Sequence, residues 1–176
     1  SIWTWPVGIA NNAFFLVLFW HSGLYADSGL QIVYIIISIY GWWNWLHGGK
    51  QSSELTISRV TAGAAVLLVL VSAASTAGLT WLLRAFTDSN VPFWDALTTA
   101  LSLTAQFMQS RKWLENWLVW MAADVVYIGL YGYKSLYLTG VLYVVFFVMC
   151  VAGYVRWRKS ITRPDALVAS TQAAGK

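Results

Sequence analysis

The sequence predicts an all-α protein that crosses a membrane several times. Of its 176 residues, 59% are hydrophobic and only 10% are charged, and the mean hydropathy is +0.60. Soluble domains typically carry about 25% charged residues, so a chain this poor in charge cannot cover a water-facing surface. Its charges lie in short clusters between long apolar runs. This alternation is typical of a multi-pass membrane protein.

Six apolar segments are the predicted spans. They cover roughly residues 6–20, 30–47, 57–82, 92–110, 113–132 and 134–157. At about 1.5 Å per residue most of them reach across a hydrocarbon core about 30 Å thick, although the first is short. Each is predicted to be a helix, because lipid offers no partner to open backbone groups. The polar residues 161–176 are predicted to form a flexible tail.

The distribution of basic residues predicts the orientation. Counting alternate loops, one side of the membrane receives nine basic residues, Lys50, Arg59, Arg111, Lys112, Arg156, Arg158, Lys159, Arg163 and Lys176, and the other receives two, Arg84 and Lys134. By the positive-inside rule, the side with nine is the cytoplasm. The C-terminus is therefore predicted to be cytoplasmic, in an inner (plasma) membrane.

The chain also contains a weak internal repeat. When positions 5–45 are aligned without gaps on positions 117–157, ten of the 41 pairs are identical. Composition alone would give about three identities. The alignment moves each helix four spans along, which predicts a parallel repeat. The expected organisation is a first repeat over 1–50 that lacks its first helix, a linker helix over 51–90 and a second three-helix repeat over 91–160, a 3+1+3 arrangement.

Several function classes find no support in the sequence. The single cysteine, Cys150, excludes a disulfide and a CxxC metal pair within the chain. There is no phosphate-binding loop, no HExxH and no GxSxG motif. We therefore expect neither an enzyme nor a cofactor. The net charge of +4 does not indicate nucleic-acid binding, because the basic residues fall in the loops, as the topology requires.

A polar stripe in segment 113–132 is the principal candidate for a substrate site. Asn116, Trp120, Asp124 and Tyr127 follow one another at spacings of four, four and three, which places them on one helix face. Asp124 would lie about 17 Å from the inner end of the helix, near the membrane midplane. Polar side chains at that depth are costly, and they usually face a cavity or another helix. The alternative to a ligand is a hydrogen bond between helices.

Further candidates come from three other segments. The predicted substrate-binding set is Asn11, Asn12, Gln31, Tyr34, Trp42, Ser102, Gln106, Asn116, Trp120, Asp124 and Tyr127. Asn12 is the repeat mate of Asp124. The rings of Tyr34, Trp120 and Tyr127 could stack on a flat ligand, at about 1–3 kcal/mol per ring, and a cationic ring would be attracted more strongly.

The tryptophan cluster near residue 43 has two interpretations. A tryptophan suits a membrane–water interface, because it joins a large apolar body to one N–H donor. By topology Trp43 and Trp45 are predicted to be such anchors, and Trp157 repeats Trp45 at the same depth. Trp42 lies on the inward stripe and stays a site candidate.

Two carboxylates are expected to be structural. Asp95 follows the residues PFW at the start of a helix, where it suits the first-turn N–H groups and the dipole. Glu115 is expected to act similarly, or to pair with Arg111 or Lys112.

Three stretches resemble the PnuC-type family of nicotinamide riboside transporters. They are PFWD at 92–95, SRKWLENWLVW at 110–120 and LYADSGLQIVYIIISIYGWWNW at 24–45. The resemblance implies a fold similar to that of the SWEET sugar transporters, with seven spans. It also implies uptake of nicotinamide riboside by facilitated diffusion, with trapping by a separate kinase, and a homo-oligomer, for which a trimer is favoured. The Pro-Gln pair typical of SWEET sugar carriers is absent.

Two alternatives stay open at this point. A relative selective for thiamine or riboflavin would look nearly identical, because pocket residues decide the substrate. A membrane-embedded binding or scaffold subunit that moves nothing is the other alternative. Polar midplane residues in a repeat favour transport, since a scaffold needs no cavity.

Overall fold

The structure, a computed structural model, describes residues 2–21 and 25–162, and this part of the chain is built from six α-helices. They are α1 (Thr4–His21), α2 (Tyr25–His47), α3 (Ala62–Phe86), α4 (Pro92–Ser110), α5 (Asn116–Tyr133) and α6 (Tyr137–Thr162), with a short 3-10 turn at Lys50–Ser52 after α2. The predicted flexible tail lies outside the described residues, apart from its first two positions, which continue α6. The all-α prediction is confirmed for the described residues.

The start of α3 is set by a capping residue and not by the start of the apolar run. Helix α3 begins at Ala62, later than predicted, because Thr61 is its N-cap. The Thr61 side-chain oxygen accepts a hydrogen bond from the backbone N–H of Ala64 at 3.4 Å. This bond satisfies one of the donors that a helix start leaves open.

Two of the described helices, α3 and α6, are long and apolar enough to cross a membrane by length and composition. The other four contain 18 to 23 residues and carry the polar stripes predicted from the sequence. Large apolar side chains such as Val69, Leu70, Val141 and Val148 are exposed on α3 and α6. Apolar surface on this scale is expected where lipid or protein covers a helix.

The described residues pack as two compact units. Unit 1 comprises residues 1–56 and 106–113, and unit 2 comprises 57–105 and 114–176. Unit 1 therefore contains α1, α2 and the end of α4, and unit 2 contains α3, the rest of α4, α5 and α6.

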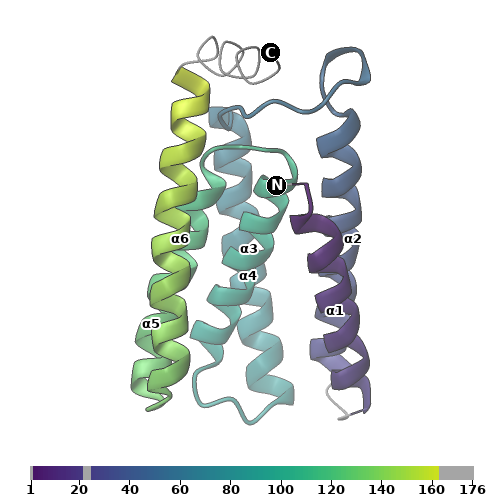
Figure 1. The fold of residues 1–176 in the computed structure, drawn as a ribbon. Helices are drawn as coiled ribbons and strands as arrows, with labels where there is room; N and C mark the ends of the chain where they lie inside the picture. The colour runs from purple at the N-terminus through teal and green to yellow at the C-terminus, as the bar shows by residue number, and fades with distance from the viewer. Residues whose placement is uncertain (1, 22–24, 163–176) are drawn as a thin grey trace. The chain divides into compact units, whose positions relative to one another are not determined.

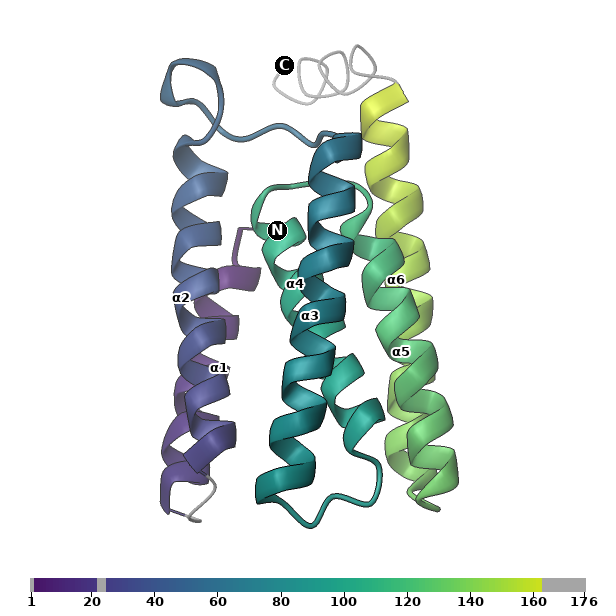
Figure 2. The same cartoon turned by 180° about the vertical axis from the view of Figure 1, so that it is seen from behind.

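In unit 1, α1 and α2 lie side by side (Figures 1 and 2). Trp5 of α1 is 1% exposed, and its ring lies against Gly41 of α2. A Cβ added at Gly41 would lie 2.7 Å from both Cζ2 and Cζ3 of Trp5. The same ring meets Trp45 edge to face, with centroids 5.3 Å apart and planes at 86°. Only glycine lets the two helices approach this closely over the indole.

In unit 2, α5 and α6 form a pair with the same contacts. Trp117 of α5 lies against Gly153 of α6, where an added Cβ would again be 2.7 Å from Cζ2 and Cζ3. Its ring meets Trp157 with centroids 5.3 Å apart and planes at 83°. These three residues are the repeat mates of Trp5, Gly41 and Trp45, so the helix-pair contacts recur at the predicted offset.

Unit 2 also contains α3, which meets α4 through hydroxyl groups. The Ser72 and Thr104 hydroxyls are 2.7 Å apart. Thr76, a buried residue of α3, donates to the Ser72 carbonyl, and Thr80 donates to the Thr76 carbonyl. The last two bonds lie within α3, whereas the Ser72–Thr104 bond joins the two helices, as polar side chains do where lipid supplies no polar partner.

Candidate functional site

The predicted polar stripe of α5 is present and turns its central carboxylate inward. Asn116 and Asp124 are buried, Asp124 with 4% of its surface exposed, and Trp120 and Tyr127 are half-buried. The Asp124 carboxylate accepts a hydrogen bond from the Cys150 thiol of α6 at 3.5 Å. In the part of the chain that the structure describes, no other hydrogen bond reaches this carboxylate. A thiol is a weak donor, so a buried carboxylate keeps most of its capacity to bind a cation or further donors.

Aromatic rings continue this site along the helix pair. The Tyr127 ring stacks on Tyr143 of α6, with centroids 4.4 Å apart and planes at 28°. Tyr131 stacks on Tyr143 from one turn further along α5, at 5.4 Å and 20°. Sequence reasoning missed Tyr131 and Tyr143, both of which stack on Tyr127. Two signals were available, since Tyr131 continues the α5 stripe and Tyr143 is the repeat mate of the predicted residue Gln31.

The predicted site residues of unit 1 differ in how deeply they are buried. Gln106 donates from Nε2 to the hydroxyl of buried Ser38 at 3.1 Å. Asn12, Gln31 and Tyr34 are half-buried, and Asn11 is exposed. Trp42 is 38% exposed. In unit 2, Ser102 is a buried residue of α4.

The anchor prediction is wrong for Trp45. Its side chain is 7% exposed, and its indole N–H donates to the Gln109 carbonyl at 2.9 Å. The Lys112 ammonium lies 4.5 Å from the ring centroid, a cation–π contact. Trp45 is therefore a core residue of unit 1. Its repeat mate Trp157 is half-buried against Trp117.

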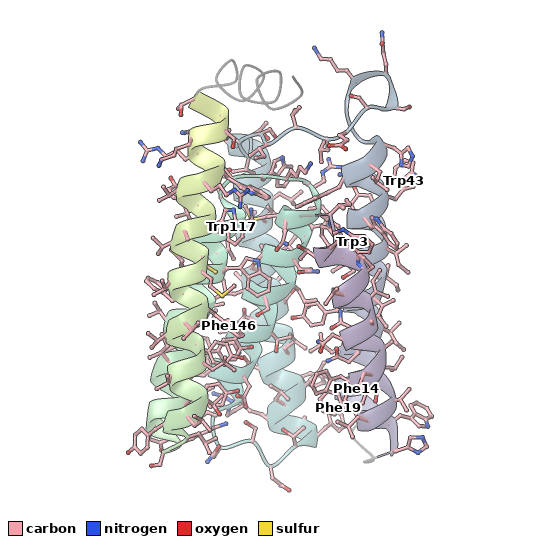
Figure 3. The ribbon with its side chains drawn as sticks, in the orientation of Figure 1. Trp3, Phe14, Phe19, Trp43, Trp117 and Phe146 are labelled. Atoms are coloured by element: carbon pink, nitrogen blue, oxygen red, sulfur yellow. The ribbon has the colours of Figure 1, made fainter. Side chains whose placement is uncertain are left out.

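Trp43 behaves differently from Trp45, because two residues along a helix turn the side chain by about 200°. It is 60% exposed and projects from α2 (Figure 3). Its ring stacks on His47 at 5.7 Å. This exposure is compatible with an interface anchor and makes Trp43 a suitable control for substitutions in the site.

Two buried indole N–H groups have no hydrogen-bond partner among the described residues. They belong to Trp5 and Trp117, the repeat mates whose rings cover Gly41 and Gly153. An unpaired buried donor costs free energy, typically about 1–3 kcal/mol. The cost therefore recurs in both helix pairs at matched positions.

The turn after α4 is fastened to the end of α2. Asn44 donates to the Ser110 carbonyl at 2.9 Å, and Lys112 donates to the Leu55 carbonyl at 2.6 Å. Lys112 adopts a positive φ of 51°. Burial lowers the pKa of its ammonium from the usual range, and the nearby Glu54 acts in the opposite direction. These contacts fix the SRKW motif within unit 1.

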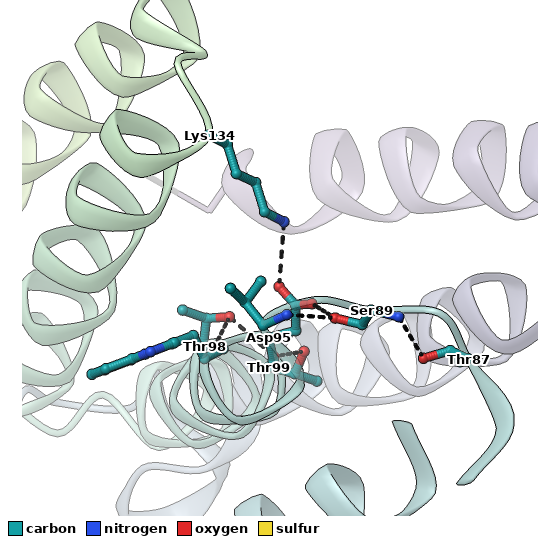
Figure 4. A network of polar contacts seen from close by, with 8 residues as sticks. Thr87, Ser89, Asp95, Thr98, Thr99 and Lys134 are labelled. Atoms are coloured by element: carbon teal, nitrogen blue, oxygen red, sulfur yellow. Dashed lines mark hydrogen bonds and ion pairs between the residues drawn. The ribbon is translucent and has the colours of Figure 1, made fainter. Parts of the chain in front are cut away.

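The two structural carboxylates bind partners other than those predicted. Asp95 lies in the first turn of α4, as predicted, but its carboxylate accepts from the Ser89 hydroxyl at 2.6 Å and lies 3.9 Å from the Lys134 ammonium (Figure 4). Glu115 makes no capping bond to α5 and accepts instead from the Val60 N–H at 2.9 Å. Glu115 thus fastens the segment before α3 to the start of α5.

Comparison with known proteins identifies the family. A family model described as nicotinamide mononucleotide transporter matches residues 1–159. The nicotinamide riboside transporter PnuC of Escherichia coli (strain K12) is 25% identical over 178 residues, which covers 87% of this chain and 74% of that protein. The riboflavin/roseoflavin transporter RibM of Streptomyces davaonensis is 25% identical over 162 residues, which covers 89% and 75%.

A solved structure shares the fold. The crystal structure of the vitamin B3 transporter PnuC superposes with a TM-score of 0.68 at 21% sequence identity, covering 93% of this chain and 74% of that one. This likeness concerns the fold alone. With the family match over most of the chain, it shows that the protein is a helical membrane transporter and not an enzyme, and that it belongs to the nicotinamide mononucleotide transporter family.

Proposed function

We propose that the chain carries nicotinamide riboside across the cytoplasmic membrane by facilitated diffusion, and that a separate kinase traps the vitamin inside the cell. The name of the relative from Escherichia coli supports this substrate. The family match supports transport in preference to a scaffold role. Nicotinamide riboside contains a flat pyridinium ring whose nitrogen is permanently charged.

The observation that carries the proposal is the burial of Asp124 beside a thiol. Among the described residues, the Asp124 carboxylate accepts one hydrogen bond, and its donor is weak. The cost of burying its negative charge is therefore poorly compensated without a ligand. A pyridinium ring supplies the missing positive charge, and the nearby Trp120 and Tyr127 offer ring surfaces. The neutral isoalloxazine of riboflavin would leave the carboxylate uncompensated. Asp124 therefore favours a cation over riboflavin, the substrate in the name of the Streptomyces relative.

The proposed binding set remains the one predicted from the sequence, with unit 2 as its better supported part. In unit 2 it comprises Ser102, Asn116, Trp120, Asp124 and Tyr127, and in unit 1 Asn11, Asn12, Gln31, Tyr34, Trp42 and Gln106. The 3+1+3 parallel repeat belongs to this proposal too. The Trp–Gly–Trp contacts that recur at matched positions of the two helix pairs support it. A homo-oligomer, with the trimer favoured, stays a prediction.

Binding of vitamins to the purified protein tests the substrate. We expect nicotinamide riboside to bind and to quench tryptophan fluorescence, and riboflavin to bind at least tenfold more weakly. Trp120→Ala should lower the affinity about tenfold, in line with about 1–3 kcal/mol for a stacked ring. Trp43→Ala, at an exposed position of α2, serves as the matched control. Tighter binding of riboflavin, or equal losses from the two tryptophan variants, would contradict the proposal.

The orientation is proposed from the distribution of basic residues. Cysteine placed at Phe86, at the exposed end of α3, should react with an impermeant maleimide added to intact cells. Cysteine placed at Ser52, in the turn after α2, should react only after the membrane is opened. The native Cys150 is buried and should stay silent in both cases. Labelling of position 52 from outside would reverse the proposed topology.

A further inference from the structure

Three tyrosines of unit 2 form one cluster of nearly parallel rings, which we call the tyrosine ladder, with the Tyr127 and Tyr131 centroids 6.0 Å apart. Tyr127 and Tyr131 come from α5, and Tyr143 comes from α6. The rings of Tyr127 and Tyr143 are 4.4 Å apart, those of Tyr131 and Tyr143 are 5.4 Å apart, and the planes are within 28° of parallel. Each of the three side chains keeps part of its surface exposed.

A carboxylate lies at each end of the ladder. Asp124 precedes Tyr127 by one helical turn on α5. Asp95 of α4 lies beside Lys134, which follows Tyr131 by one helical turn at the end of α5. Its partner Lys134 is 3.9 Å away, and both side chains are about one-third exposed, so this ion pair is loose (Figure 4). The ladder therefore connects the Asp95–Lys134 pair to the buried Asp124.

The other helix pair supplies an internal comparison. The repeat mates of Asp124, Tyr127 and Tyr131 are Asn12, Phe15 and Phe19. The Phe15 and Phe19 rings also lie face to face in part, at 5.5 Å and 32°. Plain phenyl rings therefore suffice to pack a helix pair of this geometry.

The carboxylate of Asp124 and the hydroxyl groups of the three tyrosines are not needed for this packing. At the positions of Asp124 and the tyrosine ladder, α5–α6 carries a carboxylate and three phenol groups, whereas the matched positions of α1–α2 carry two phenyl rings and the amides of Asn12 and Gln31. Polar groups inside a membrane are costly and mark ligand or ion pathways. The acidic and phenolic oxygens at these four positions of α5–α6 point to a positively charged ligand.

We propose that the tyrosine ladder is an approach site for planar organic cations of the N-substituted pyridinium class, leading from Asp95 to Asp124. The inference rests on the proposed function and adds Tyr131, Tyr143 and Asp95 to it. An incoming cation replaces Lys134 at the Asp95 carboxylate, then passes along electron-rich rings and phenol oxygens, and is held at Asp124. A row of similar weak contacts guides a cation without trapping it on the way.

Substitutions in the ladder, measured with a charged and a neutral ligand, test this inference. The probes are nicotinamide riboside and its reduced form, which has nearly the same shape and no charge on the ring. Tyr143→Leu should weaken binding of the cation roughly tenfold and of the neutral form less than twofold, because a cation–π contact is lost. Tyr143→Phe keeps the ring and should cost about threefold. Phe146→Leu, on the same helix (Figure 3), is the matched control and should leave both affinities unchanged, because the Phe146 ring meets Tyr143 only edge to face.

The possible results distinguish a failure of the ladder proposal from a failure of the proposed function. Binding of the cation to the wild-type protein, with no loss in a folded Tyr143→Leu variant, would overturn the ladder and leave the proposed function intact. Equal losses for both ligands would also overturn it, since they would indicate altered packing. Failure of the wild-type protein to bind nicotinamide riboside would overturn both. If Tyr143→Leu does not fold, as judged by its thermal unfolding, Tyr131→Leu decides the question by the same criteria.

Discussion

Gly41→Ala and Gly153→Ala should each lower the thermal unfolding midpoint of the protein, although alanine normally stabilises a helix relative to glycine by about 0.5–1 kcal/mol. The added methyl would lie 2.7 Å from two ring carbons of Trp5 or Trp117. Trp5 is 1% exposed and held against Trp45, so it has no room to move aside. Overpacking of this kind costs about 1–3 kcal/mol.

Two other helical glycines provide the control. A Cβ added at Gly8 or Gly129 would meet nothing within 4 Å, so alanine at either position should leave the midpoint unchanged or raise it. The double variant Gly41→Ala/Trp5→Phe should recover part of the loss, because the smaller ring makes room for the methyl group. A Gly41→Ala variant that unfolds at or above the wild-type temperature would show that the helix pair does not depend on this contact.

Much of the fold could be predicted because the relevant signals are local. The apolar lengths indicated the number of helices in the described residues, and the bounds of α4 at Pro92 and Ser110 agree with the prediction. The start of α3 differed because a cap at Thr61 outweighed hydropathy. The identities between the two aligned stretches marked Trp5, Gly41 and Trp45, which the structure brings into contact.

Parts of the site could not be predicted, because they depend on contacts between distant segments. A tryptophan suits both an interface and a core, so the burial of Trp45 is decided by Gln109 and Lys112, which lie far along the chain at the end of α4. Helix α6 is apolar on every side, so its sequence does not indicate which residues face α5. Tyr143 and Cys150 are recognised as neighbours of the stripe only through their contacts with Tyr127 and Asp124.

Asp124→Asn should reduce uptake of nicotinamide riboside into proteoliposomes by more than tenfold. The substitution keeps the shape of the side chain and removes its charge, and the loss of a buried charge partner costs about 2–5 kcal/mol. Asp88→Asn makes the same chemical change at an exposed position in the loop after α3 and should leave uptake unchanged. Comparable uptake by the two variants would remove Asp124 from the proposed site.

Uptake by the wild-type protein in the same vesicles, with no kinase inside, tests the central claim most directly. We expect nicotinamide riboside to enter until its internal level matches the electrochemical balance of the cation, at about 2.3 kcal/mol per charge for each 100 mV. With the membrane voltage held at zero, the internal and external concentrations should become equal, whether or not a proton or sodium gradient is imposed. Accumulation above the external concentration under such a gradient at zero voltage, or no uptake at all, would contradict passive transport of nicotinamide riboside by this chain.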